Sequence, residues 1–168
     1  MPVPAWMSIE GEVQGNISSG AGDKKSIGNL AKSGHEDEIL VWKWNSGVTQ
    51  PTDLASGGPS GTRVHDAVKI TKMFDKSSPL LYQALCSGEI LTKIEVKFYR
   101  VEGASETHYF SITLEEAIVT EVKAWMPNFQ DKSQAYLQQM EDVSFRYKKI
   151  LWENISTSTS TEDDWEQE

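Results

Sequence analysis

Apolar and polar side chains alternate along several stretches of this chain, and the alternation is clearest in three of them. These stretches are Ile94–Tyr99, Tyr109–Leu114 and Val143–Lys148. Successive side chains of a β-strand point to opposite faces, so a period of two predicts strands that are buried on one side only. Weaker alternation marks residues 5–12, 38–44, 64–72 and 117–125. The pattern predicts at least seven strands and a mainly β fold of antiparallel sheets, either a sandwich or a closed barrel.

One stretch, residues 75–89 (DKSSPLLYQALCSGE), breaks the alternation and has helical spacing instead. Its apolar stripe consists of Leu80, Leu81, Ala84 and Leu85. The residues able to cap its first amide groups are Asp75, Ser77 and Ser78. Pro79 suits a first turn, where its missing N–H costs nothing, and Gly88 suits a left-handed stop. The sequence therefore predicts one short helix over about residues 78–87, with its stripe packed against one opening of the β-structure.

A long segment, VTQPTDLASGGPSGTR at residues 48–63, separates two of the predicted strands. Structureless connections longer than about 12–15 residues are uncommon in compact domains and are usually functional or disordered. Folded back on itself, an extended loop of this length projects roughly 25 Å. A domain of 168 residues has a radius of gyration of about 15 Å. The long extended loop, over about residues 48–62, can therefore reach well onto a neighbouring molecule.

Three other stretches show neither period: residues 16–34, 126–139 and 155–168. The last is a Ser/Thr run that ends in acidic residues. Such a composition buries too little apolar surface to order itself, which predicts a largely disordered, flexible acidic tail. We therefore expect a single domain over residues 1–154, followed by this tail.

The negative net charge of the chain argues against some classes of binding partner. It has 16 basic and 25 acidic residues and a net charge of −9, which disfavours binding to nucleic acid or to anionic lipid. No stretch approaches the 18 or so consecutive apolar residues of a membrane-spanning helix. The first residues, MPVPAWMSIEGE, have neither a basic start nor a continuous apolar core, so we expect no signal peptide and synthesis in the cytoplasm.

Candidate chemistry is sparse. The histidines are far apart: His35, His65 and His108. Their spacing favours hydrogen-bonded histidines over a metal site. The single cysteine, Cys86, excludes an internal disulfide, and its place in the last helical turn predicts a small packed side chain. Trp42 and Trp44 share one face of a predicted strand, which favours core packing over a stacking platform. The sequence therefore predicts no catalytic, metal or cofactor site, and no enzyme.

Residues 69–100, KITKMFDKSSPLLYQALCSGEILTKIEVKFYR, resemble the strand–helix–strand core of the haemolysin-coregulated protein (Hcp) family. Members of this family are tube subunits of the bacterial type VI secretion system. Further blocks resemble the family in the same order: PAWMSIEGEVQG, PTDLASGGPSGTRVHD, YFSITLEEAIVT, MEDVSFRYKKILWEN and the acidic-Trp ending EDDW. Together these blocks extend from about Pro2 to Trp165.

The resemblance implies a compact β-barrel of two antiparallel sheets with one short α-helix at its side. It also implies that the subunits close into hexameric rings, which stack into an inner tube and can carry small effectors in the lumen. The implied partners are further copies of the chain, the spike protein, sheath and baseplate components, and small effector proteins, with no nucleic acid and no membrane insertion. The implied route is export from the bacterial cytoplasm, by the secretion machine, to the outside or into a target cell.

In the Hcp family the long loop lies against the adjacent subunit and the next ring. The resemblance therefore implies an interface loop made of Val48, Thr49, Gln50, Pro51, Asp53, Leu54, Ser56, Gly57, Gly58, Pro59, Ser60 and Gly61. The family-like helix motif comprises Asp75, Lys76, Ser77, Ser78, Pro79, Leu80, Ala84 and Gly88.

The alternative from another functional class is a small-ligand-binding β-barrel carrier, with a mouth that the helix or the loop covers. An excess of small or polar side chains facing inward would favour such a carrier. The alternating strands of this chain carry large apolar side chains on one face instead.

Overall fold

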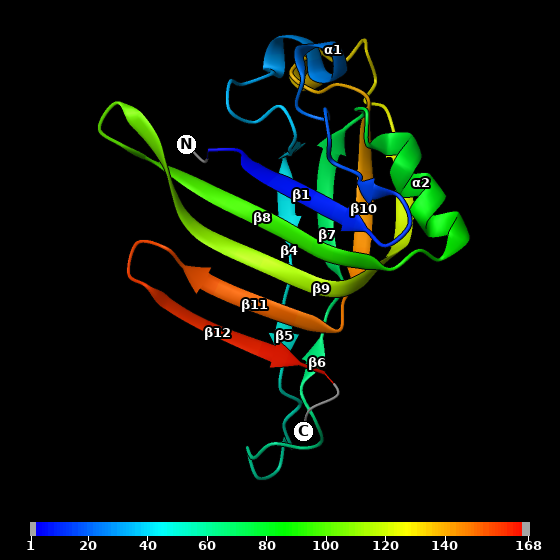
Figure 1. The fold of residues 1–168 in the computed structure, drawn as a ribbon. Helices are drawn as coiled ribbons and strands as arrows, with labels where there is room; N and C mark the ends of the chain where they lie inside the picture. Colours follow the sequence, from blue (N-terminus) through cyan, green and yellow to red (C-terminus); the bar gives the residue numbers. More distant parts are fainter. Residues whose placement is uncertain (1–2, 166–168) are drawn as a thin grey trace.

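A computed structural model describes residues 3–165 and shows a mainly β fold of two antiparallel sheets with two short helices (Figure 1). The helices are α1 (Lys24–Ile27) and α2 (Ser78–Ser87), and short 3-10 turns lie at Gly28–Leu30 and Lys132–Gln134. The strands are β1 (Ala5–Gly11), β2 (Gly15–Asn16), β3 (Ile39–Val41), β4 (Lys43–Asn45), β5 (Val48–Thr49), β6 (Val64–His65), β7 (Val68–Met73), β8 (Leu91–Glu102), β9 (Ser105–Trp125), β10 (Met140–Arg146), β11 (Lys149–Asn154) and β12 (Thr159–Asp164). The predicted mainly β class with two antiparallel sheets is confirmed, and α1 is a second short helix that the sequence did not predict.

The long strand β9 belongs to both sheets. Its first part pairs with β8 and β11, and its second part, from Ile118 onward, pairs with β10. Between the two parts, Glu116 has a positive φ of 50°, and a register shift against β10 follows between Val119 and Glu121. The sequence predicted two separate strands in this region, over residues 109–114 and 117–125. The structure corrects this to one strand, because a single residue in the left-handed region bends the chain from one sheet into the other without a loop.

The segment Ile39–Asn45 makes a second link between the sheets. Its first part, β3, pairs with β1, and its second part, β4, pairs with β7. Between them the Trp42 N–H donates to the Thr71 carbonyl oxygen at 2.8 Å. The first sheet therefore has the order β2 and β3 beside β1, then β8, β9, β11 and β12, and the second has the order β9, β10, β7, β4. The small pair β5 and β6 stands apart from both.

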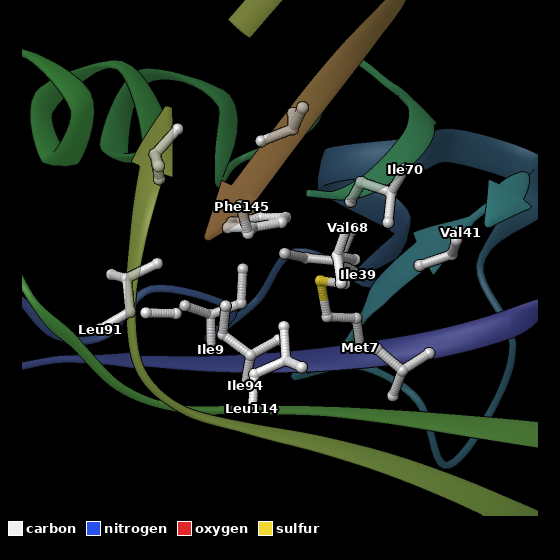
Figure 2. Close-up of a cluster of buried hydrophobic side chains, with 14 of the residues drawn as sticks. Met7, Ile9, Ile39, Val41, Val68, Ile70, Leu91, Ile94, Leu114 and Phe145 are labelled. Atoms are coloured by element: carbon white, nitrogen blue, oxygen red, sulfur yellow. The ribbon is translucent and has the colours of Figure 1, made fainter. Parts of the chain in front are cut away.

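The core lies between the two sheets. Met7 and Ile9 reach it from β1, Leu114 from β9 and Phe145 from β10, and all four are fully buried (Figure 2). The apolar members of the three clearly alternating stretches all face this core or pack against it. The period of two therefore identified the inward faces of the strands correctly.

Helix α2 has the predicted bounds and packs beside β9. Pro79 lies in its first turn, and Gly88 ends it with the left-handed φ of 69°. Leu81 and Ala84 are buried. Cys86, in contrast, is exposed, so the prediction of a packed cysteine was wrong. Its position falls outside the buried stripe of the helix.

The predicted flexible tail contains a strand. Residues Thr159–Asp164 form β12, which pairs with β11 along its whole length, and Ser158 takes a positive φ of 56° in the turn between them. The expectation of disorder over 155–168 is therefore wrong for this strand, and residues 166–168 lie outside the described part of the chain. Alternation is absent because both faces of β12 are polar. The strand forms through backbone pairing with β11, and its β-branched threonines favour it.

Candidate assembly surfaces

The long loop predicted over 48–62 is an ordered hairpin in the structure. Strands β5 and β6 pair at its base, and an antiparallel bridge joins Thr52 to Pro59 further out. The Ser60 N–H donates to the Pro51 carbonyl oxygen at 2.9 Å. In Figure 1 this hairpin projects away from the two sheets, on the side opposite α1. We call residues 48–65 the projecting hairpin.

Asp53 organises the tip of the projecting hairpin. Its backbone N–H donates to the Gly58 carbonyl at 2.7 Å, and its carbonyl accepts from the Gly57 N–H at 2.8 Å. Its carboxylate accepts from the Ala55 N–H at 3.0 Å and from the Ser56 hydroxyl at 3.1 Å. These hydrogen bonds hold the pKa of Asp53 below its usual range. The tip is therefore pre-formed and negatively charged at neutral pH.

Apolar side chains on the projecting hairpin face solvent. Leu54 is fully exposed at the tip, and Val48 and Val64 are about half exposed at the base. The remaining predicted loop residues lie on the hairpin between these points. Gln50 donates to the Gly61 carbonyl oxygen at 3.0 Å, and Gly57 and Gly61 adopt positive φ. The hairpin thus presents an apolar tip on a backbone that is already ordered.

The C-terminal strand holds the base of the projecting hairpin. Arg63 donates to the Asp163 carboxylate at 2.9 Å and to the Asp164 carbonyl oxygen at 2.9 Å. The buried His65 ring has one nitrogen 2.7 Å from Asp163 and the other 2.6 Å from the Tyr147 hydroxyl. Trp165 stacks over His65 with ring centres 5.4 Å apart. We call Arg63, His65, Tyr147, Asp163 and Trp165 the C-terminal latch.

The electrostatics of the C-terminal latch follow from these contacts. Hydrogen bonds from Arg63, and then from His65, lower the pKa of the Asp163 carboxyl. Burial, together with the nearby Asp163 charge, raises the pKa of the Tyr147 hydroxyl to about 12. Asp163 is therefore an anion at neutral pH and Tyr147 remains a neutral donor. Sequence patterns do not indicate that these residues contact one another, although the acidic-Trp ending EDDW contains Asp163 and Trp165.

The family-like helix motif fixes α2 to the second sheet through buried charges. The Lys72 ammonium lies 2.5 Å from Glu141 and 2.9 Å from Asp75, and all three side chains are at most 1% exposed. Ser78 donates its hydroxyl to Glu141 at 2.6 Å. Asp75 also accepts from the Ser77 N–H at 2.8 Å, in the turn before the helix, whereas the N-cap residue Ser77 makes no side-chain cap hydrogen bond. Of the other motif residues, Pro79 lies in the first turn of the helix, Ala84 is buried and Gly88 ends the helix. Lys76 is exposed, and its backbone N–H donates to the Ser26 hydroxyl.

Each of the three histidines has a hydrogen-bond partner, in line with the interpretation of the sequence. His35 lies 3.2 Å from Glu38 and stacks on Trp6 with ring centres 4.3 Å apart. His108 lies 2.6 Å from the Ser111 hydroxyl. His65 belongs to the C-terminal latch. His35 and His108 both contact the Tyr99 ring, each with its ring centre 5.4 Å from that of Tyr99.

Trp42 and Trp44 do not share a strand, because the chain passes from one sheet to the other at Trp42. Trp44 packs on the main core, with its ring at 5.6 Å and edge-on to Phe98, whereas Trp42 packs on a second cluster around Trp6. All four rings line one surface pocket of about 490 Å³. We call it the tryptophan pocket, lined mainly by Ala5, Trp6, Val41, Trp42, Trp44 and Phe98.

Comparison with known proteins identifies the family. A family model described as "Type VI secretion system effector, Hcp" matches residues 6–154. The major exported protein of Pseudomonas aeruginosa is 48% identical over 166 residues, which cover 98% of this chain and 96% of that protein. A crystal structure of an Hcp protein superposes with a TM-score of 0.94 at 44% identity, covering 98% of this chain and 99% of that one.

A second solved structure, the secreted protein Hcp3 from Pseudomonas aeruginosa, superposes with a TM-score of 0.80 at 42% identity and covers 96% of this chain and 99% of its own. Within residues 3–165, no helix is both long and apolar enough to cross a bilayer. The matches run nearly from end to end of this chain and of its relatives. The chain therefore belongs to the Hcp family of the type VI secretion system.

Proposed function

We propose that this protein is the tube subunit of a type VI secretion machine. Its copies close into hexameric rings, and the rings stack into the inner tube that the machine expels with small effectors in the lumen. Membership of the Hcp family supports this role, and so does the name of the exported Pseudomonas aeruginosa relative. The observation that carries the proposal is the projecting hairpin, an ordered arm that ends in the exposed Leu54.

The hairpin suits an interface because its own hydrogen bonds already order it. A pre-formed arm loses little conformational entropy on binding, so more of the contact energy remains as affinity. Burying a fully exposed leucine contributes about 1.5–3 kcal/mol. In a closed ring each subunit has two neighbours through head-to-tail contacts, so the same gain is repeated at every contact. Since about 1.4 kcal/mol is tenfold in an association constant, removing Leu54 should weaken each contact at least about tenfold.

The proposed role is structural and requires no catalysis and no cofactor. The protein would be made in the bacterial cytoplasm, where the rings assemble beside the spike protein, the sheath and the baseplate, and would leave the cell with the expelled tube. The carrier alternative is less well supported. Large side chains such as Met7, Leu114 and Phe145 fill the space between the sheets, so a ligand there would have to displace them.

Replacing residues 50–59 by a short Gly-Ser linker tests the proposal. We expect a native circular-dichroism spectrum, a mass distribution shifted from rings to monomers in light scattering, and no secretion. Leu54→Asp is the matched single substitution. Its control is Val101→Asp, which places the same charge at another exposed apolar position. Normal rings, stacks and secretion in both loop variants would contradict the proposed role of the hairpin.

A further inference from the structure

The tryptophan pocket is another apolar feature of the surface, and it lies away from the hairpin tip. Its walls come from the start of β1, from residues 40–44 and from Phe98 on β8. The chain runs from this pocket through β4 and β5 into the projecting hairpin, which carries the tip to the far side of the molecule (Figure 1). The tip of a given molecule therefore points away from its own pocket.

The rim of the pocket is basic. Lys32 and Lys43 both border it. The Lys32 ammonium already contacts Glu106, whereas the exposed Lys43 ammonium makes no ion pair with any residue between 3 and 165. At the hairpin tip, the Asp53 carboxylate is solvent-exposed and directly precedes Leu54. The pocket and the tip are therefore complementary in two respects. The pocket offers apolar surface for the exposed Leu54, and its rim offers the Lys43 ammonium for the Asp53 carboxylate.

Two polar groups in the pocket wall are also unpaired. The indole N–H groups of Trp6 and Trp42 are buried and have no acceptor within residues 3–165. A segment that enters the pocket with backbone carbonyls could satisfy them after a small movement of the rings. The Leu54 tip offers such carbonyls, because its turn is closed through other atoms of Asp53, Gly57 and Gly58.

We propose that the tryptophan pocket receives the Leu54 tip of a second copy of this chain. Each copy carries one tip and one pocket on different faces, so the contact is head-to-tail and every molecule both gives and receives it. Leu54 fills the apolar space between Trp42 and Trp44, and Asp53 pairs with Lys43 at the rim. This inference rests on the proposed function, in which the hairpin contacts a neighbouring subunit, and specifies the surface that the hairpin meets.

Disulfide trapping tests the contact directly. In a Cys86→Ser background, Ala55→Cys at the tip is combined with Lys32→Cys at the pocket rim, which leaves Asp53, Leu54 and Lys43 in place, and the protein is oxidised mildly at a concentration where it assembles. A disulfide requires Cα atoms within about 7 Å, so only a tip seated at the pocket rim reacts. The matched control combines Ala55→Cys with Val101→Cys, which is exposed and does not line the pocket. We expect covalent dimers and higher multiples from the tip–rim pair, and mainly monomers from the control.

The outcomes separate this inference from the proposed function. Light scattering and negative-stain images of the same reduced proteins report whether rings form. Rings without tip–rim cross-links would overturn the pocket assignment and leave the ring proposal standing; this is also the result expected if the pocket holds a small apolar ligand instead. A protein that forms no rings in the absence of any substitution would overturn both.

Discussion

Lys72 is the buried cation that joins α2 to the second sheet, and its removal gives a sharp test of the packing. Lys72→Met keeps a long, flexible apolar side chain at the site but deletes the ammonium. Glu141 and Asp75 then remain at most 1% exposed, with no cation beside them. Removing one partner of a buried ion pair costs about 3–5 kcal/mol. Since a typical domain is stable by about 5–15 kcal/mol, this single change should remove a large part of the stability.

Two other substitutions serve as controls, because each should lower the stability less than Lys72→Met does. Glu141→Gln leaves the ammonium opposite one carboxylate, that of Asp75, and keeps an acceptor near Ser78. It should cost only about 1.5–3 kcal/mol, the value of one hydrogen bond to a charged group. Lys123→Met removes an ammonium that is 69% exposed and 3.7 Å from Glu121. A surface pair of this kind contributes about 0–1 kcal/mol.

Urea unfolding followed by circular dichroism measures these differences. All variants are compared at one protein concentration, because self-association adds a concentration-dependent term to the apparent stability. We expect the midpoint to fall most for Lys72→Met, less for Glu141→Gln and least for Lys123→Met, with similar slopes. If Lys72→Met unfolds within about 1 kcal/mol of the unchanged protein, the ammonium does not hold the helix in place and the reasoning fails.

Three further predictions concern the C-terminal part and the helix. Asp163→Asn removes the charged acceptor of Arg63, so amide hydrogen exchange should accelerate in β12 and at the base of the projecting hairpin; unchanged exchange rates would show that the C-terminal latch does not hold the hairpin. The lowered pKa of Asp163 means that its stabilisation is complete above the usual aspartate pKa of about 3.9 and is lost as the pH falls through the lower folded value. The unchanged protein should therefore lose more stability than Asp163→Asn on acidification to that range, and equal losses in unfolding experiments would refute this. Because Cys86 is exposed, a thiol reagent should label it in the folded protein, and Cys86→Ser should change stability by at most about 0.5 kcal/mol; a thiol that reacts only after unfolding would contradict the structure.

The elements that sequence patterns predicted correctly depend on local signals. The inward faces of the strands follow from alternation, because a strand that covers a core must place every second side chain against it. Helix α2 follows from its stripe, from Pro79 at its start and from Gly88 at its end. The bend of β9 could not be predicted in this way. Period-two patterns continue on both sides of Glu116, and one left-handed residue leaves no trace in hydropathy.

The C-terminal latch shows what the sequence does not reveal. Arg63 and Asp163 are 100 residues apart, and only the fold brings them together. Strand β12 is polar on both faces, so a composition that usually indicates disorder hides a strand that is held by backbone pairing and by Arg63. The prediction for Cys86 failed for a local reason. The apolar stripe identifies the buried side of the helix, but it does not show whether a residue next to the stripe, such as Cys86, is covered. The tryptophan pocket could not be predicted either, because it forms only where the chain passes from one sheet to the other at Trp42.

The mass of the native protein in solution tests the central claim most directly. Size-exclusion chromatography with light scattering, followed by negative-stain imaging, should be done at tens of micromolar protein. A hexameric ring predicts a mass of about 113 kDa, six times the 18.8 kDa of one chain, and ring-shaped particles with a central hole. A single species of 18.8 kDa with no rings on the grid would contradict the account.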